Sequence, residues 1–168
     1  MPSRKPDSKP KKNPSDVLII ADSEHSADML YATGMFVPDP FVYLRRKGKG
    51  MLCMSDLEFD RASKEAPHCD VISLSKIQAT LRRQGVRQAG WGEVACWLLR
   101  KHRIKTIQVP ENFPLKMARI IAQGCPEVVL EACEVFPERL IKTPREIRHL
   151  QDALRMTEIG LQVAVRTL

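Results

Sequence analysis

The sequence has no long hydrophobic run, few aromatic residues and no closely spaced pair of cysteines. Its longest apolar runs, Val17–Ala21 and Val94–Leu99, are far shorter than the roughly 18 residues that a membrane-spanning helix needs. Aromatic residues make up only 5% of the 168 positions, which leaves few rings for stacking on nucleic-acid bases. These shortages exclude a membrane protein and make nucleic acid an unlikely partner.

The five cysteines are odd in number and none forms a C-x-x-C motif. The basic opening segment leads into only five apolar residues and then Asp22, which excludes a signal peptide. We therefore expect reduced thiols and a cytoplasmic location. The adjacent pair His68–Cys69 has no second ligand cluster near it in the sequence, so we do not predict a metal site there.

Motifs for enzymatic chemistry are also missing. The sequence contains no glycine-rich phosphate loop, no G-x-S-x-G elbow and no pair of histidines at H-x-x-x-H spacing. His25 lies in a strand-to-helix loop, where α/β folds often place active groups, but no second motif supports it. We predict no catalytic residue, no metal ligand and no cofactor in this chain.

Positive charge is abundant, with a net charge of +7. Residues 1–16 carry five Lys and Arg against two Asp, four prolines and, apart from Met1, no large apolar residue, so we expect a disordered basic tail. Three further basic clusters, Arg45–Lys49, Arg82–Arg87 and Arg100–Lys105, fall on a predicted turn and two predicted helix ends, where cations are favourable for local reasons.

Short apolar or alternating segments predict strands at 17–21, 41–44, 51–54, 71–74, 106–109 and 128–130. Helical spacing predicts helices over about 23–33, 55–66, 75–84, 91–103 and 113–124. The turn Arg45–Gly50 joins two strands as a hairpin. Strands that alternate with helices, together with one hairpin, predict an α/β fold with a mixed five- or six-stranded sheet flanked by helices.

Polar residues mark the expected helix starts. Ser23 and Ser26 precede the first helix, and the segments Ser55–Glu58 and Ser75–Gln78 match the capping-box pattern. Gly34 is placed to end the first helix.

The last segment predicts a long amphipathic helix. Thr143, Pro144 and Glu146 form a helix start, and apolar residues then recur every seven positions at Ile147, Leu154, Leu161 and Leu168. A helix of about 25 residues needs a surface to pack on. It either packs on this domain or in a dimer, or it begins a second domain that this chain lacks; we favour the second domain.

Two segments resemble the creatinase and Xaa-Pro peptidase family, which includes prolidase and aminopeptidase P. Ser26–Phe36 resembles the family segment N-I-x-Y-L-T-G-F, and Leu140–Ile147 followed by Ala153 resembles the junction R-x-I-K-T-P-E-E-I-x-x-I-R-x-A. The positions that match are Tyr31, Thr33, Gly34, Lys142, Thr143 and Glu146. Ala32 and Met35 stand where the family often has larger or aromatic residues.

The resemblance implies a creatinase-like N-terminal domain of ribonuclease-H-like topology over residues 17–141. Residues 142–168 would then be the linker and the first helix of a catalytic domain. In the family that domain binds two divalent metals (Mn, Co or Zn), and its metal ligands lie after the junction. The expected partners are this catalytic domain, a second copy in a homo-oligomer and a peptide substrate.

The implied function is that of a non-catalytic domain which serves oligomerisation and access to the active site of an Xaa-Pro dipeptidase or aminopeptidase-like metallohydrolase. By position, the loop Phe36, Val37, Pro38 and Asp39 is the candidate substrate-access loop. Two alternatives stay open: a stand-alone binding or oligomerisation module without peptidase activity and, as the less favoured one, a basic nucleic-acid-binding domain.

Overall fold

The chain divides into two compact units, Met1–Val135 and Phe136–Leu168, and the computed structural model describes residues 15–167. The tail predicted over residues 1–16 lies, except for its last two residues, outside the described residues. The two units are described one after the other.

The first unit is built on a mixed six-stranded sheet with the strand order β4-β3-β2-β1-β5-β6. The strands are β1 (Val17–Ala21), β2 (Phe41–Arg46), β3 (Lys49–Met54), β4 (Cys69–Ser73), β5 (Thr106–Pro110) and β6 (Val129–Cys133). β2 is antiparallel to β1 and β3, whereas the pairs β3–β4, β1–β5 and β5–β6 are parallel. The predicted mixed sheet is confirmed.

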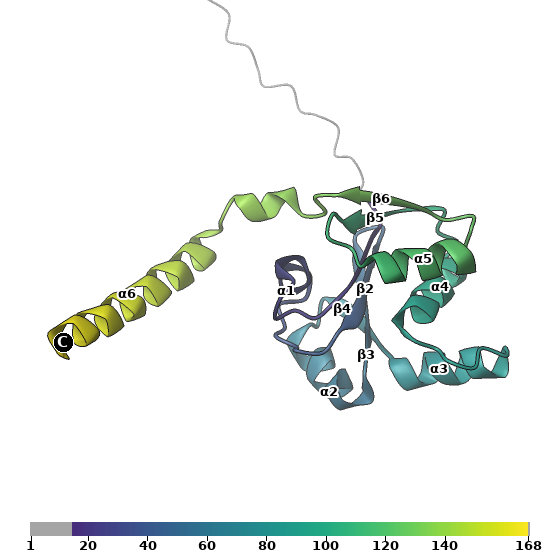
Figure 1. Ribbon diagram of the computed structural model, residues 1–168, viewed down its shortest axis with the longest axis horizontal. Helices are drawn as coiled ribbons and strands as arrows, with labels where there is room; N and C mark the ends of the chain where they lie inside the picture. Colours follow the sequence, from purple (N-terminus) through teal and green to yellow (C-terminus); the bar gives the residue numbers. More distant parts are fainter. Residues whose placement is uncertain (1–14, 168) are drawn as a thin grey trace, which may run out of the picture. The chain divides into compact units, whose positions relative to one another are not determined.

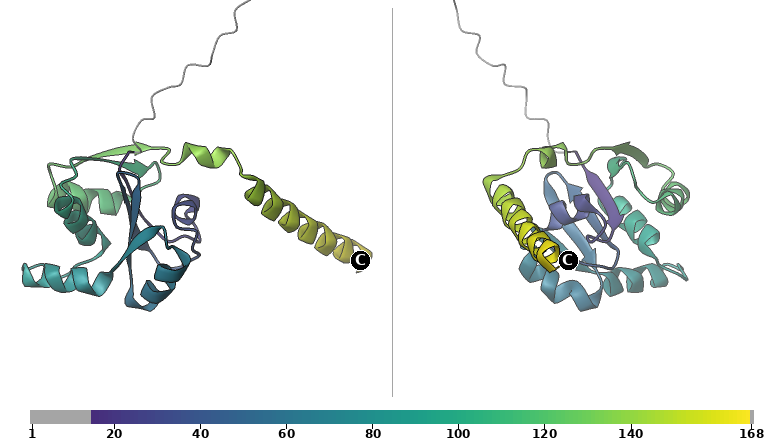
Figure 2. Two further views of the ribbon diagram at one scale, coloured as in Figure 1. Left: turned by 180° about the vertical axis from the view of Figure 1, so that it is seen from behind. Right: turned by 60° about the vertical axis from the view of Figure 1, so that its left-hand side comes forward.

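Helices cover both faces of this sheet (Figure 1). Figure 1 and Figure 2 show α1 (Ala27–Thr33) and α2 (Asp56–Glu65) on one side and α3 (Leu74–Arg83), α4 (Trp91–Lys101) and α5 (Leu115–Gly124) on the other. Because side chains alternate along a strand, Leu18 and Ile20 join the core cluster under α3, α4 and α5, while Val17 and Ile19 are buried on the opposite face. Continuous apolar runs such as Val17–Ala21 arise from this double coverage.

The hairpin between β2 and β3 is tighter than predicted. Lys47 and Gly48 both have positive φ angles, 49° and 82°, which is the signature of a type I′ turn and matches the twist of the two strands. The strands therefore extend to Arg46 and from Lys49, whereas the sequence predicted a longer turn over Arg45–Gly50.

Two predicted helix starts are wrong. α1 begins at Ala27, because the Oγ of Ser26, rather than that of Ser23, accepts the capping hydrogen bond from the Met29 amide at 3.2 Å. α3 begins at Leu74, because Ser73 is its N-cap and accepts from the Lys76 amide at 3.3 Å.

Two serines in those patterns do not cap a helix with their side chains. The Oγ of Ser75 donates a hydrogen bond to Asp56 Oδ1 at 3.0 Å. This bond connects α3 to the start of α2. Ser55 does precede α2, but its side chain makes no capping hydrogen bond.

The second unit consists of a short 3₁₀ helix, η1 (Pro137–Leu140), and α6 (Pro144–Thr167). None of the described residues of α6 is buried within the unit, and its exposed apolar residues include Ile147, Leu150, Leu154, Met156, Ile159, Leu161, Val163 and Val165. Across residues 15–167 no helix, α6 included, combines the length and the hydropathy that crossing a membrane requires.

Candidate functional site

The candidate access loop starts where α1 ends. Gly34 has a φ of 69° and its amide bonds the Leu30 carbonyl at 2.7 Å, a helix end in the left-handed conformation that glycine adopts without strain. The buried Thr33 hydroxyl donates to the Met29 carbonyl at 2.9 Å and accepts from the Met35 amide at 3.2 Å. Thr33 and Gly34, two of the motif positions, thus fix the direction in which the chain leaves the helix.

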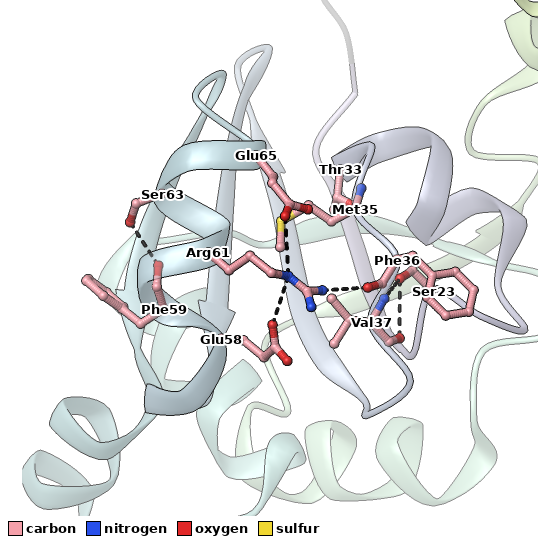
Figure 3. Close-up of polar contacts among 10 residues, drawn as sticks. All are labelled: Ser23, Thr33, Met35, Phe36, Val37, Glu58, Phe59, Arg61, Ser63 and Glu65. Carbon is pink, nitrogen blue, oxygen red and sulfur yellow. Dashed lines mark hydrogen bonds and ion pairs between the residues drawn. The ribbon is translucent and has the colours of Figure 1, made fainter.

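Ser23 holds the middle of the loop. Its Oγ accepts from the Val37 amide at 2.7 Å and donates to the Val37 carbonyl at 3.3 Å, and its own amide donates to the same carbonyl at 3.0 Å. Both residues are buried, and Figure 3 shows the serine facing the loop backbone. This role leaves no local signal in the sequence, because a serine before a helix resembles a cap while the bonded partner is fourteen residues away.

Arg61 of α2 holds the loop from its other side. Its Nη2 donates to the Phe36 carbonyl at 2.5 Å, and its Nε lies 3.1 Å from Glu58 Oε2 and 3.7 Å from Glu65 Oε1 (Figure 3). The Phe36 backbone is therefore fixed from α2 while its side chain remains 58% exposed. The loop presents an aromatic ring on a fixed backbone.

A cavity of about 310 Å³ adjoins the loop. Its lining residues are Val37, Asp39, Pro40, Phe41, Met54, Ser55, Leu57, Glu58 and Trp91. Most of this lining is apolar, and it carries two carboxylates, Asp39 and Glu58, of which Glu58 is paired with Arg61. No hydrogen bond joins Ser55 Oγ to either carboxylate among the described residues.

The histidines do not gather at this loop. His25 Nδ1 lies 3.0 Å from Asp22 Oδ1 and its side chain is exposed; the hydrogen bond from the His25 amide lowers the pKa of Asp22. His68 Nε2 contacts the Ala32 carbonyl at 3.1 Å. No three His, Cys, Asp or Glu side chains within residues 15–167 could hold a metal ion, so the two-metal chemistry that the resemblance implies is assigned to no residue here.

The cysteines are free thiols, and four of them are buried. Burial raises the pKa of Cys53 and Cys96 to about 12 and that of Cys69 to about 11. At neutral pH these thiols stay protonated, which leaves them unsuited to attack a substrate.

The junction residues form the predicted helix start in the second unit. The Thr143 amide and hydroxyl each lie 2.7 Å from Glu146 Oε2, and the Glu146 amide lies 3.3 Å from Thr143 Oγ1. These bonds make a reciprocal capping box and lower the pKa of Glu146. Lys142 donates to the Arg139 carbonyl at the end of η1. The structure thus gives these motif residues a local structural role, whereas Tyr31 lies exposed on α1.

Comparison with known proteins gives matches in structure alone. No protein-family model matches the chain, and no curated protein matches its sequence. Among solved structures, X-Pro aminopeptidase from Thermotoga maritima matches with a TM-score of 0.72 and 19% identity, over 92% of this chain and 41% of that one. Xaa-Pro dipeptidase from Bacillus anthracis matches with a TM-score of 0.71 and 13% identity, over 92% of this chain and 39% of that one.

A third match covers most of this chain and most of the solved chain. Aminopeptidase P from Streptococcus thermophilus matches with a TM-score of 0.55 and 10% identity, over 76% of this chain and 85% of that solved chain. The fold that the two sequence motifs implied is therefore confirmed as a fold that occurs in Xaa-Pro peptidase structures. The chain spans about two-fifths of the length of the first two structures.

Proposed function

We propose that this chain is the non-catalytic N-terminal domain of an Xaa-Pro dipeptidase or aminopeptidase-like metallohydrolase. The observation that supports this most is the fold shared over 92% of this chain with only about two-fifths of two Xaa-Pro peptidases. In this proposal, residues that follow Leu168 in the full-length protein supply the ligands of two divalent metals. The free thiols support a cytoplasmic location for the enzyme.

Within that enzyme, the loop Phe36 to Asp39 serves access to the active site. Its backbone is fixed by Ser23 from one side and Arg61 from the other, so contact with a peptide requires little further ordering of the chain. The exposed Phe36 ring and the adjacent cavity of about 310 Å³ supply apolar surface for a substrate side chain or for the rim of a neighbouring subunit's active site.

A reading-frame and activity test addresses the proposal directly. We expect the frame after Leu168 to encode two aspartates, a histidine and two glutamates in the order of the family. The full-length protein with Mn²⁺ or Co²⁺ should then hydrolyse X–Pro dipeptides or longer X–Pro peptides, and the 168-residue chain alone should not. A stop codon after Leu168, or turnover by the chain alone, would contradict the proposal.

The access role is tested in the full-length protein by Phe36→Ala. Loss of the exposed ring should raise KM for an X–Pro peptide several-fold and leave kcat within twofold, because the ring contacts substrate and no reacting atom. Leu115→Ala is the matched control: it removes an exposed apolar side chain from α5, on the other face of the sheet. Equal effects of the two variants would exclude an access role for Phe36.

A second candidate is a stand-alone binding or oligomerisation module. The exposed apolar side chains of α6 support it, because such a helix gains stability when a partner covers it. Sedimentation equilibrium of the chain between micromolar and millimolar concentration distinguishes the cases. Assembly that Leu154→Gln abolishes would favour this module, and a monomer at every concentration would exclude an assembly role for the chain by itself.

A further inference from the structure

The fold joins two basic clusters that the sequence separates. Arg46, Lys47 and Lys49 of the β2–β3 hairpin line one cavity of about 430 Å³ together with His102 at the end of α4. In the sequence the hairpin cluster and the cluster after α4 are far apart, and each is explained by its own local structure.

Strand directions explain why the clusters meet. β1 begins at the sheet end where β2 finishes, since Val17 pairs with Arg45, and the parallel strand β5 begins at that end too. Asp16 links the elements there: its carbonyl accepts from the Gln108 amide at 2.9 Å, and its carboxylate accepts from the Lys47 amide at 3.0 Å.

This end of the sheet, which we call the basic end, carries a clear excess of positive charge. Its cations are Arg45, Arg46, Lys47, Lys49, Lys101, Arg103 and Lys105. Against them stand Asp16, Asp70 and Glu127, which precedes the parallel strand β6, and Asp70 forms an ion pair with Lys49 at 2.7 Å. Lys47, Lys101, Arg103 and Lys105 are all exposed.

The cations at the basic end contribute to a lowered pKa of His102. Its pKa is lowered first by burial and then by the neighbouring Arg46 and Lys101, while Asp16 acts weakly in the opposite sense. Its Nε2 is buried and has no hydrogen-bond partner among the described residues. Arg46 and Lys101 both act on the imidazole, so an anion that approaches His102 meets a positive potential.

The described part of the chain begins at the same end of the sheet. The Ser15 carbonyl accepts from Arg45 Nε at 3.4 Å, so the first described residue lies at the basic end. Residues 1–14 contain five Lys and Arg and one Asp.

The chemical class of the binding partner follows from which side chains lie beside these cations. The exposed aromatic side chains of the described residues, Tyr31 and Phe36, belong to α1 and to the loop held by Ser23, at the opposite end of β1. Lys101 covers the Trp97 ring at 4.6 Å. Among the described residues, the basic end thus has cations but no exposed aromatic ring. Such a surface can bind a phosphate backbone, but it cannot provide the stacking that unpaired bases need.

We propose that the basic end binds double-stranded nucleic acid through its phosphate backbone, without sequence preference. This function is independent of the proposed peptidase role, because it uses none of the residues of the access loop or of α6.

Fluorescence anisotropy of the full 168-residue chain with a random-sequence 20-base-pair DNA duplex, at several salt concentrations, tests the proposal. Each phosphate contact contributes about −0.9 to the slope of log K against log salt. Lys47→Gln/Lys49→Gln/Lys105→Gln should weaken binding at least tenfold at low salt and reduce the slope by about 2 to 3. Deletion of residues 1–14 should weaken binding in the same direction.

The matched control is Lys76→Gln/Lys116→Gln/Arg119→Gln, which removes the same charge from exposed positions on α3 and α5 near the other end of the sheet. We expect its affinity to stay within twofold to threefold of the wild type. Equal weakening by both triple variants would mean that net charge alone drives binding and would overturn the proposal. Absence of salt-sensitive binding at low ionic strength would overturn it as well.

Two further measurements address the site and the partner. Duplex binding should raise the pKa of His102 in an NMR titration, because phosphates offset Arg46 and Lys101; an unchanged pKa would place binding elsewhere and refute the proposal. The chain could instead bind a single strand, or vesicles of anionic phospholipid, more tightly than the duplex. That result would overturn the proposal and identify the tighter ligand as the partner.

Discussion

Replacing Ser23 by alanine is the sharpest test of how the candidate access loop is held. The Ser23→Ala variant removes the Oγ that accepts from the Val37 amide at 2.7 Å. The Val37 carbonyl keeps its bond from the residue 23 amide at 3.0 Å, but the Val37 N–H is left buried without an acceptor. An unpaired buried donor costs about 1 to 3 kcal/mol.

We therefore expect the free energy of unfolding to fall by about 2 kcal/mol, with a decrease in Tm of about 4 to 8 °C. Urea denaturation followed by far-UV circular dichroism measures the first quantity and a thermal scan the second. Hydrogen exchange adds a local readout, because the Val37 amide should lose protection more than amides in β1 do.

Ser63→Ala is the matched control. The Ser63 hydroxyl donates to the Phe59 carbonyl at 2.9 Å on the exposed side of α2, and such a bond contributes less than about 0.5 kcal/mol. If Ser23→Ala also stays within 0.5 kcal/mol of the wild type, Ser23 does not hold the loop as we argue.

Three further predictions concern groups that are buried or half-buried. The pKa of His102 lies below its usual value, so the unfolded chain binds a proton that the folded chain does not; the free energy of unfolding should fall as pH drops below about 6.5. His102→Gln should flatten that decline in urea titrations at pH 7.5 and 5.5, and an unchanged slope would show that His102 is not its source. Iodoacetamide should alkylate Cys133, the only half-buried thiol of the described residues, before the four buried ones; mass spectrometry should show that Cys133→Ser abolishes the fast step, and persistence of that step would refute the assignment. Gly50→Ala would place a Cβ 2.7 Å from Cys69 Sγ and 3.0 Å from the Tyr43 ring, so it should lower the free energy of unfolding by about 1 to 2 kcal/mol, and neutrality in chemical denaturation would contradict the tight contact between β3 and β4.

Local patterns were sufficient for most of the fold. The apolar run Val17–Ala21 and the paired strands around the hairpin predicted β1, β2 and β3, because burial on one or both faces leaves a direct trace in the sequence. Local patterns do not fix the helix starts. Ser73 and Ser75 are both residues that can cap a helix, and only the hydrogen bonds of the folded chain show that Ser73 is the N-cap.

The candidate site depended more on long-range contacts. Residues near the loop were found through a family motif, but its two supports, Ser23 and Arg61, bond partners fourteen and twenty-five residues away. The same limit applies to the basic end. Arg46 and His102 meet because β1 runs parallel to β5 and antiparallel to β2, and a strand order of this kind leaves no periodic signal in either cluster.

The exposed apolar residues of α6 couple its secondary structure to its surroundings. No described residue of this helix is buried within its unit, so its helical state draws little support from tertiary packing there. Any surface that covers Ile147, Leu154 and Leu161 would also stabilise the backbone hydrogen bonds beneath them. Helix content, followed by ellipticity at 222 nm, therefore becomes a direct optical reporter of whether α6 is occupied, whether by another domain or by a second copy of the chain.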